Sequence, residues 1–234
     1  MNTIEKICLV TGASSGIGNA IAKTLLAEKY RVIATARRKD RLRQLEIDDI
    51  LTGDLCNYNF QDSIENYILG KYGKCDYLFN CAGTIEVGSI EEIDIDRMTS
   101  MLRLNIESTF RLTYKFLKLF KKQGFGHVIN ISSVLGTKVR TTAGAYSATK
   151  FAIEALSEAL RMELTGTNIK ITCIEPGLVM TELHNDWPVH PKESMNIQEP
   201  LSVENIVETV KFILKQPEHV RIPKLMILPK DHNI

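Results

Sequence analysis

Three pairs of residues in this sequence have the spacing Tyr-x-x-x-Lys, which puts a phenol and an ammonium group one helical turn apart. They are Tyr67/Lys71, Tyr114/Lys118 and Tyr146/Lys150. Helix neighbours at this spacing meet whether or not they do chemistry, so the spacing alone selects none of them. Tyr146 stands out because Ser133 precedes it by thirteen residues, at the end of the apolar run 127–132. The same step back leads from the other two tyrosines to Asp54 and Met101.

A tyrosine, a lysine and a serine in this arrangement can exchange a proton with an alcohol or a carbonyl oxygen. A free tyrosine has a pKa of about 10 and is a poor base at neutral pH. We expect the ammonium group of Lys150 to lower the pKa of Tyr146, because a nearby positive charge stabilises phenolate. The Ser133 hydroxyl can hold the substrate oxygen by a hydrogen bond. Small residues at 143–145 and 147–149 leave room for a nicotinamide and a substrate beside Tyr146.

A glycine-rich turn follows the first apolar run, 6–11, and leads into a helical pattern. Its glycines allow positive φ and close backbone approach, and the helix N-terminus offers free N–H groups to a pyrophosphate. A nucleoside triphosphate loop would require a lysine after the last glycine, whereas Asn19 follows here. We therefore predict that a dinucleotide binds at Thr11, Gly12, Ser14, Ser15, Gly16, Ile17 and Gly18.

The second apolar run, 30–36, indicates which dinucleotide is used. Sites selective for NAD carry an acidic residue roughly 20 residues beyond the glycine turn, on the ribose 2′-hydroxyl. Here Ala36 stands 18 residues after Gly18, and Arg37 and Arg38 follow it. Because a guanidinium suits a 2′-phosphate, the sequence favours NADP(H). The alternative interpretation is a solvated basic run over 37–43.

The elements that must position these residues alternate along the chain. Apolar runs typical of strands occur at 6–11, 30–36, 50–53, 76–80, 127–132, 169–174 and 224–228. Helical patterns lie between them, at 16–28, 60–72, 98–122, 146–165 and 202–216. This alternation predicts an α/β fold with a parallel sheet, and we expect residues 1–234 to form a single doubly wound domain. The proline-containing stretch 182–200 is expected to be a substrate loop or lid, or else a surface loop.

Composition narrows the class of partner. The chain has 234 residues, of which 44% are hydrophobic, and its 29 basic and 28 acidic residues leave a net charge of +1. Such a balance favours neither nucleic acid nor an anionic membrane. Without a leader or a long apolar span, a cytoplasmic protein is expected. The five cysteines include no C-x-x-C pair, so we predict free thiols and no metal site.

In this order the motifs resemble the short-chain dehydrogenase/reductase family, and the resemblance covers nearly the whole chain. It rests on the turn 11–18, on Asn80-Cys-Ala-Gly83, on Asn105 and Ser133, on Tyr146 with Lys150, and on Pro176-Gly-Leu-Val-Met-Thr181. The resemblance implies a Rossmann-type domain with a seven-stranded, mostly parallel sheet flanked by helices. Its implied catalytic residues are Asn105, Ser133, Tyr146 and Lys150, with Ser133 and Tyr146 touching the substrate.

The resemblance also implies further cofactor contacts. Lys150 would bind the nicotinamide ribose together with Tyr146, and Asn105 would support a proton-relay water. The remaining implied contacts are Asp54, Leu55, Asn80, Ala82, Gly83, Pro176, Gly177, Val179 and Thr181. Two positions depart from the family pattern: Cys81 in the second motif, and Ser15, where many NADP-using relatives have a basic residue. Asp54 has a second interpretation, as a cap of a helix or turn.

The strand end 32–38 and the C-terminal stretch 216–229 are similar to NADP-dependent 3-hydroxy acid dehydrogenases, a branch that includes serine dehydrogenases. The expected reaction interconverts a small ketone or aldehyde with its alcohol, and a 3-hydroxy acid is the favoured substrate. Alternatives are a 3-oxoacyl thioester reductase, a non-catalytic NADP-sensing protein, and a dehydratase or epimerase. The resemblance further implies a homotetramer formed through the apolar helical segments 98–122 and 146–165.

Overall fold

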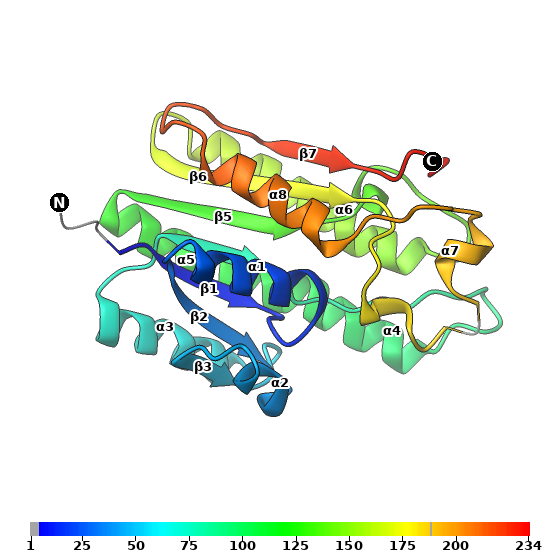
Figure 1. The fold of residues 1–234 in the computed structure, drawn as a ribbon, viewed down its shortest axis with the longest axis horizontal. Coiled ribbons are helices and arrows are strands. Elements are labelled where there is room, and N and C mark those ends of the chain that lie inside the picture. The colour runs from blue at the N-terminus through cyan, green and yellow to red at the C-terminus, as the bar shows by residue number, and fades with distance from the viewer. Residues whose placement is uncertain (1–4, 188) are drawn as a thin grey trace.

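The computed structural model describes residues 5–187 and 189–234, and within them seven strands form one sheet in the order β3-β2-β1-β4-β5-β6-β7 (Figure 1). All neighbouring strands pair in parallel, which confirms the predicted fold class. Each predicted strand is found, with ends shifted by a few residues. The strands are β1 Ile7–Thr11, β2 Arg31–Ala36, β3 Asp49–Thr52, β4 Tyr77–Asn80, β5 Phe125–Ile131, β6 Asn168–Pro176 and β7 Lys224–Ile227.

The helices connect these strands and cover both faces of the sheet (Figure 1). The α-helices are α1 Gly16–Ala27, α2 Lys39–Arg43, α3 Tyr58–Tyr72, α4 Ile95–Leu102, α5 Thr109–Gln123, α6 Gly144–Glu163, α7 Pro191–Ser194 and α8 Val203–Leu214. Short turns of other helical types are η1 Arg103–Ser108, η2 Val134–Gly136 and η3 Glu182–His184. The predicted segment 98–122 is therefore three elements, because the π-helical turn η1 separates α4 from α5.

Successive residues of the strands face opposite layers, as the two-residue period of a strand requires. In β1, Leu9 belongs to a cluster packed under α3, α5 and α6, whereas Val10 belongs to a cluster packed under α1 and α8. Phe116 and Phe120 of α5 fill the first layer and are fully buried. Because both faces of each central strand are covered, these strands are apolar throughout rather than alternating.

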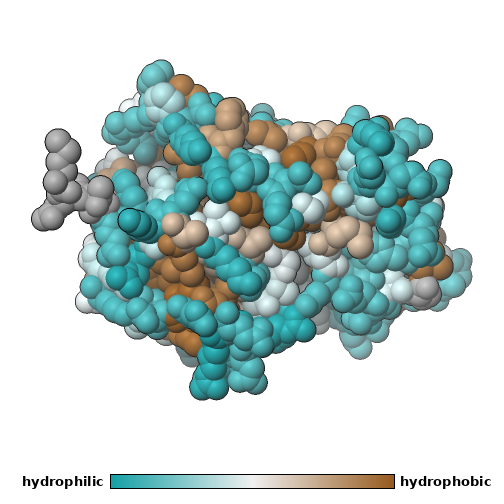
Figure 2. All heavy atoms as spheres, in the orientation of Figure 1, coloured by the Kyte–Doolittle hydropathy of each residue, from teal (hydrophilic) through white to brown (hydrophobic). Residues whose placement is uncertain are grey.

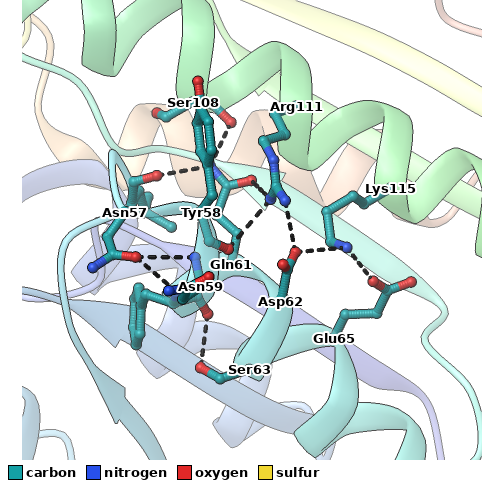
Figure 3. A network of polar contacts seen from close by, with 12 residues as sticks. Asn57, Tyr58, Asn59, Gln61, Asp62, Ser63, Glu65, Ser108, Arg111 and Lys115 are labelled. Atoms are coloured by element: carbon teal, nitrogen blue, oxygen red, sulfur yellow. Dashed lines mark hydrogen bonds and ion pairs between the residues drawn. The ribbon is translucent and has the colours of Figure 1, made fainter.

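Helix α3 is held against α5 by charged side chains rather than by apolar packing alone (Figure 3). Arg111 donates to the carboxylate of Asp62 at 2.7 Å, and Lys115 lies 3.0 Å from the same carboxylate. Asn57 caps the N-terminus of α3 by accepting from the amide of Asn59 at 2.9 Å. These contacts hold α3 and α5 together in the layer that covers one face of the sheet.

The exposed surface is largely polar (Figure 2), although α5, α6 and α8 expose the hydrophobic side chains of Tyr114, Phe151, Met162 and Phe212. Figure 2 shows hydrophilic side chains over most of one face of the molecule, with hydrophobic ones gathered in a few patches. In the described part of the chain, no helix combines the length and apolar character needed to cross a bilayer.

The order of the strands decides where a site can form. Strand β1 pairs with β2 on one side and with β4 on the other, so the chain changes direction across the sheet between β1 and β4. In doubly wound sheets, ligands bind beyond the carboxyl ends of the strands at this switch point. The turn that follows β1 is the glycine-rich turn 12–18. The strand order and the glycine motif therefore both predict a site at the carboxyl edge of the sheet, next to β1.

Candidate active site

A cavity of about 850 Å³ opens along the carboxyl edge of the sheet. The segments that follow each of the seven strands line it, together with α6. The structure brings most of the predicted site residues to this one wall. They are Gly12, Ser14, Ser15, Gly16, Ile17, Gly18, Arg37, Arg38, Asp54, Leu55, Ala82, Gly83, Ser133, Tyr146, Lys150, Pro176, Gly177, Val179 and Thr181.

The glycine turn owes its shape to backbone contacts that leave no room for side chains. Gly12 has φ +66°, and a Cβ there would lie 2.8 Å from the backbone of Ala82. A Cβ on Gly18 would lie 2.6 Å from the carbonyl oxygen of Gly12. The turn runs directly into α1, whose first residues Gly16, Ile17 and Gly18 line the cavity, and the free N–H groups of a helix N-terminus can hold an anion.

Three predicted site residues, Thr11, Asn80 and Asn105, are buried behind the cavity wall rather than on it. The Thr11 hydroxyl donates to the carbonyl of Phe79 at 3.2 Å and accepts from the amide of Ala82 at 3.1 Å. Asn80 donates to Asn130 at 2.8 Å. Thr11 thus ties the end of β1 to the end of β4, and Asn80 ties the end of β4 to β5. Together they support the glycine turn from behind the cavity wall.

Asn105 lies in the π-helical turn η1 and connects three elements. Its amide nitrogen donates to the carbonyl of Thr84 at 2.8 Å and to the hydroxyl of Thr149 at 3.3 Å. Its side-chain oxygen accepts from the amide of Thr84 at 3.0 Å and would lie 3.2 Å from a Cβ on Gly83. Such π-turns within α-helices are frequent at functional sites. Here the turn locks the segment after β4 against α6.

Arg38 reaches from the end of β2 to the glycine turn. Its guanidinium donates to the hydroxyl of Ser14 at 3.1 Å and to that of Ser15 at 2.5 Å. Asp54, after β3, lines the cavity and also accepts from the amide of Cys56 at 2.9 Å. Asp54 therefore caps a turn, as the second interpretation predicted, and also lines the cavity.

The Tyr146 ring and the Lys150 ammonium group face each other on the first turns of α6. The Lys150 Nζ lies 5.7 Å from the ring centre and donates to the carbonyl oxygen of Ile131 at 2.9 Å. Ser133, two residues beyond Ile131, accepts from the amide of Leu135 at 3.1 Å and so caps η2. Tyr146, Lys150 and Ser133 are each at most 9% exposed. These groups can move a proton at an oxygen atom held in the cavity.

The expected net lowering of the Tyr146 pKa is wrong for this structure, because burial outweighs the lowering effect that is present. Burial raises the pKa of Tyr146 to about 12, and a hydrogen bond with Ser133 lowers it only in part. Burial also lowers the pKa of Lys150 to about 8, against smaller raising effects of Cys173, Cys81 and Glu154. Both shifts have one physical cause, because a desolvated site disfavours phenolate and ammonium alike. In this state the phenol keeps its proton at neutral pH.

The two other Tyr-x-x-x-Lys pairs lie outside the cavity wall. Tyr67 and Lys71, on α3, both donate to the carboxylate of Asp49 at the start of β3. That carboxylate is fully buried, so the pair serves to satisfy a charge in the core. Tyr114, on α5, is 43% exposed. Context, not spacing, therefore distinguishes Tyr146 from the other two tyrosines.

The stretch 182–200 forms one end of the cavity wall, to which it contributes His184, Trp187 and Met195. It contains η3 and α7, while Pro188 lies outside the described residues. Arg140 and His232 complete this end, although no sequence motif marks either of them. They come from loops that meet only in the folded chain, so no spacing pattern could reveal them.

Arginine and histidine side chains, together with Asp186, line this end of the cavity. Burial, with smaller effects of the neighbouring His190 and Arg140, lowers the pKa of His184 to about 4. Burial, then Arg140, lowers the pKa of His232, while Asp231 opposes this. Among the described residues, Arg140 has no carboxylate partner within 4.0 Å, whereas Arg97 on the same wall pairs with Glu86 at 2.9 Å. The Nη1 of Arg140 contacts the Sδ of Met195, and a guanidinium with no carboxylate beside it can hold an anion.

The family model described as "short chain dehydrogenase" matches residues 6–191. The chain belongs to the short-chain dehydrogenase family. An uncharacterized oxidoreductase of Staphylococcus aureus is 33% identical over 231 residues, which are 96% of this chain and 97% of the relative. This dehydrogenase is therefore an oxidoreductase of that family.

Two solved structures have the same fold over nearly their full length. A closed form of serine dehydrogenase complexed with NADP⁺ has a TM-score of 0.87 at 28% identity, covering 94% of each chain. A variant of actinorhodin polyketide ketoreductase with NADPH has a TM-score of 0.86 at 27% identity, covering 98% of each chain.

The cysteines of the dehydrogenase are free thiols, as predicted. Cys81, the departure within the second motif, lines the cavity, and burial raises its pKa to about 12. A thiol with a raised pKa is a weak nucleophile at neutral pH, so Cys81 acts here as a small wall residue. Across residues 5–187 and 189–234, no group of three or more His, Cys, Asp or Glu side chains is arranged to hold a metal ion.

Proposed function

We propose that this dehydrogenase uses NADP(H) to interconvert a small ketone or aldehyde with its alcohol, within a single domain formed by residues 1–234. The observation that carries the proposal is that Ser133, Tyr146 and Lys150 line the same cavity as the glycine turn 12–18. A phosphate-binding turn and a buried proton-transfer group are the two parts that hydride transfer at a carbonyl requires.

The residues present fit a dinucleotide that carries a 2′-phosphate. Gly12 and Gly18 leave the backbone open at the N-terminus of α1, where a pyrophosphate is stabilised. Arg37 and Arg38 line the wall at the end of β2, where NAD sites carry an acid. The NADP⁺ and NADPH bound in the serine dehydrogenase and ketoreductase structures support the same choice.

In the proposed mechanism the bound nicotinamide supplies or accepts the hydride. Ser133 donates a hydrogen bond to the substrate oxygen, and Tyr146 donates its phenolic proton to that oxygen as the alcohol forms. Because Tyr146 is protonated at neutral pH in this structure, reduction needs no prior change of its state. Lys150, anchored on the carbonyl of Ile131, would hold the ribose and stabilise the phenolate left behind. Asn105 is proposed to support the proton path from behind the wall.

We propose a substrate with a carboxylate, such as a short 3-hydroxy acid and its 3-oxo form. Arg140 supports this, since its guanidinium lines the cavity without a carboxylate partner among the described residues. The serine dehydrogenase structure is consistent with a small polar acid. The ketoreductase similarity supports a second candidate, reduction of a 3-oxoacyl thioester. A carrier-linked substrate has no free carboxylate next to its ketone, so the two candidates differ in their need for Arg140.

For the assembly we propose a homotetramer built on α5 and α6. These helices expose Tyr114, Phe151 and Met162, at 43%, 41% and 68%, which is consistent with cover by another copy. A monomeric mass in solution scattering would contradict it. We propose the cytoplasm as the compartment, because free thiols persist where the glutathione pool is reducing.

The test of the proposed function is a substrate screen that follows NADPH absorbance, with NADH as the comparator. Short 3-oxo acids, simple aldehydes and a 3-oxoacyl thioester form the panel. We expect turnover with NADPH in clear preference to NADH, and the Arg38→Met variant should lose that preference. Binding of NADPH without turnover on any carbonyl would instead indicate an NADP-sensing protein.

A further inference from the structure

Glu182, the first residue of η3, bridges two arginines that lie far from it in the sequence. Its carboxylate accepts from the Nη1 of Arg38 at 3.0 Å and pairs with the guanidinium of Arg41. All three side chains are between 41% and 47% exposed. The two arginines lower the pKa of Glu182, so its carboxylate is ionised at neutral pH.

The bridge lies beside the glycine turn. The remaining N–H groups of Arg38 point to the hydroxyls of Ser14 and Ser15 in that turn. Thr181, next to Glu182, would lie 3.3 Å from a Cβ on Gly16. The segment 181–182 therefore runs over the turn, and the carboxylate of Glu182 is the anion that the Arg38 guanidinium holds in this structure.

We propose that Glu182 is a specificity-determining residue that competes with the 2′-phosphate of the cofactor for Arg38 and Arg41. The proposal rests on the proposed function, in which Arg38 takes the 2′-phosphate. A guanidinium binds carboxylate and phosphate through the same N–H groups, and a dianionic phosphate repels a carboxylate beside it. A nucleotide with a 2′-phosphate must therefore displace Glu182, whereas one without it leaves the bridge intact. Glu182 thus reduces the preference for NADP(H) below what the arginines alone would give.

A different role for Glu182 predicts the opposite sign. If the carboxylate only orients Arg38 for the phosphate, its removal weakens the binding of 2′-phosphorylated nucleotides. If it competes, its removal strengthens that binding. The exposure of the bridge limits the size of the effect, because exposed ion pairs contribute little and are screened by salt.

The experiment compares two small probes by titration calorimetry at low and at physiological salt. Adenosine 2′,5′-bisphosphate carries the 2′-phosphate, and 5′-AMP lacks it. Glu182→Gln is expected to lower the Kd of the bisphosphate about 3- to 10-fold and to leave that of 5′-AMP unchanged within about 2-fold, with a smaller gain at higher salt. An unchanged or higher Kd for the bisphosphate in Glu182→Gln would overturn the proposal.

Glu199→Gln is the matched control, because it removes the same charge from the same stretch. Glu199 pairs with Lys230 at 2.9 Å and, within the described part of the chain, forms no ion pair with either arginine. An equal gain in Glu199→Gln would show that net charge, not displacement, governs binding, and would overturn the competition. Failure of the proposed function is distinguishable: a wild-type chain that binds both probes equally does not recognise a 2′-phosphate at all.

Discussion

The Nζ of Lys150 lies 5.7 Å from the ring centre of Tyr146, and its hydrogen bond to the carbonyl of Ile131 fixes it there. The ammonium group is thus tied to the end of β5, the strand end that also carries Ser133. Helix α6 and β5 together set the distance between the proton donor and the group that stabilises its conjugate base. The arrangement predicts how the two residues respond separately to mutation and to pH.

Tyr146→Phe removes the phenolic proton and leaves the ring in place. We expect kcat for carbonyl reduction to fall by about 10²-fold or more, as for loss of a general acid, while NADPH binding is retained. Tyr67→Phe is the matched control, because it changes the tyrosine of another Tyr-x-x-x-Lys pair. It should keep full activity but lose about 1–3 kcal/mol of unfolding free energy, since buried Asp49 loses a donor. Near-normal turnover by Tyr146→Phe would contradict the mechanism.

The pH profile of reduction tests Lys150. Burial lowers the pKa of Lys150 to about 8, so the ammonium form predominates below that pH and is lost above it. Because the positive charge stabilises the phenolate that forms as Tyr146 gives up its proton, kcat should be level below pH 8 and fall at higher pH. Lys150→Met should be slow at every pH and lack this step. A wild-type profile that stays level to pH 10 would rule out this role for the ammonium charge.

Substrate charge tests Arg140. Arg140→Met should raise the KM for a short 3-oxo acid about 10- to 100-fold, since a charge-assisted hydrogen bond contributes about 1.5–3 kcal/mol. The KM for the methyl ester of the same acid should not change. Arg97→Met is the control, because Arg97 lines the same cavity but is already paired with Glu86. Equal losses in both variants, or equal losses for acid and ester, would favour the thioester candidate.

The sequence predicted those residues of the site whose position is set by the end of a single strand. Gly12 follows β1 directly and Ser133 lies two residues beyond the end of β5, so their position relative to the sheet edge is set by the chain itself. The position of Thr11 is likewise set by the end of its strand. Its hydroxyl, however, lies behind the cavity wall, where it hydrogen-bonds the backbone at the end of the neighbouring β4. A strand-end polar residue can face the cavity or brace it, and spacing does not distinguish the two.

The parts that the sequence did not predict depend on contacts between distant loops. Arg140 lies in the loop after η2 and His232 is near the C-terminus, and both line the cavity only because the fold brings these distant segments together. The π-helical turn was also hidden, because the segment 98–122 has an ordinary helical period. In the structure the hydroxyls of Ser108 and Thr109 both donate to the carbonyl of Leu104, which occupies an acceptor that a regular α-helix would use.

The glycine turn makes a steric prediction. Gly12→Ala would put a Cβ 2.8 Å from the backbone of Ala82 and strain a residue at φ +66°, so a loss of about 2–4 kcal/mol in unfolding free energy is expected. Gly70→Ala, inside α3, meets nothing within 4 Å and should stabilise the protein by up to about 1 kcal/mol. Urea denaturation measures both. Equal stability of the two variants would contradict the close approach of β1 and β4 segments at Gly12.

Buried His127 makes a prediction about acid stability. Burial, and then Lys170, lowers its pKa to about 3, and its Nε2 lies 2.9 Å from the hydroxyl of Thr172. A free histidine has a pKa of about 6.5, so between pH 6.5 and pH 3 the unfolded chain binds a proton that the folded chain does not. Stability must therefore fall as the pH falls through this range. For His127 alone the loss between pH 7 and pH 5 is about 2 kcal/mol.

His127→Gln keeps a group that can bond to Thr172 and has no proton to take up. The difference in unfolding free energy between pH 7 and pH 5, measured by urea denaturation, should therefore shrink by about 2 kcal/mol. His184, whose pKa burial lowers to about 4, contributes with the same sign and leaves a residual slope. His219→Gln is the matched control, because it removes an imidazole at an exposed position. If His127→Gln also keeps the full dependence, the imidazole is protonated in the folded chain and β5 must accommodate its charge.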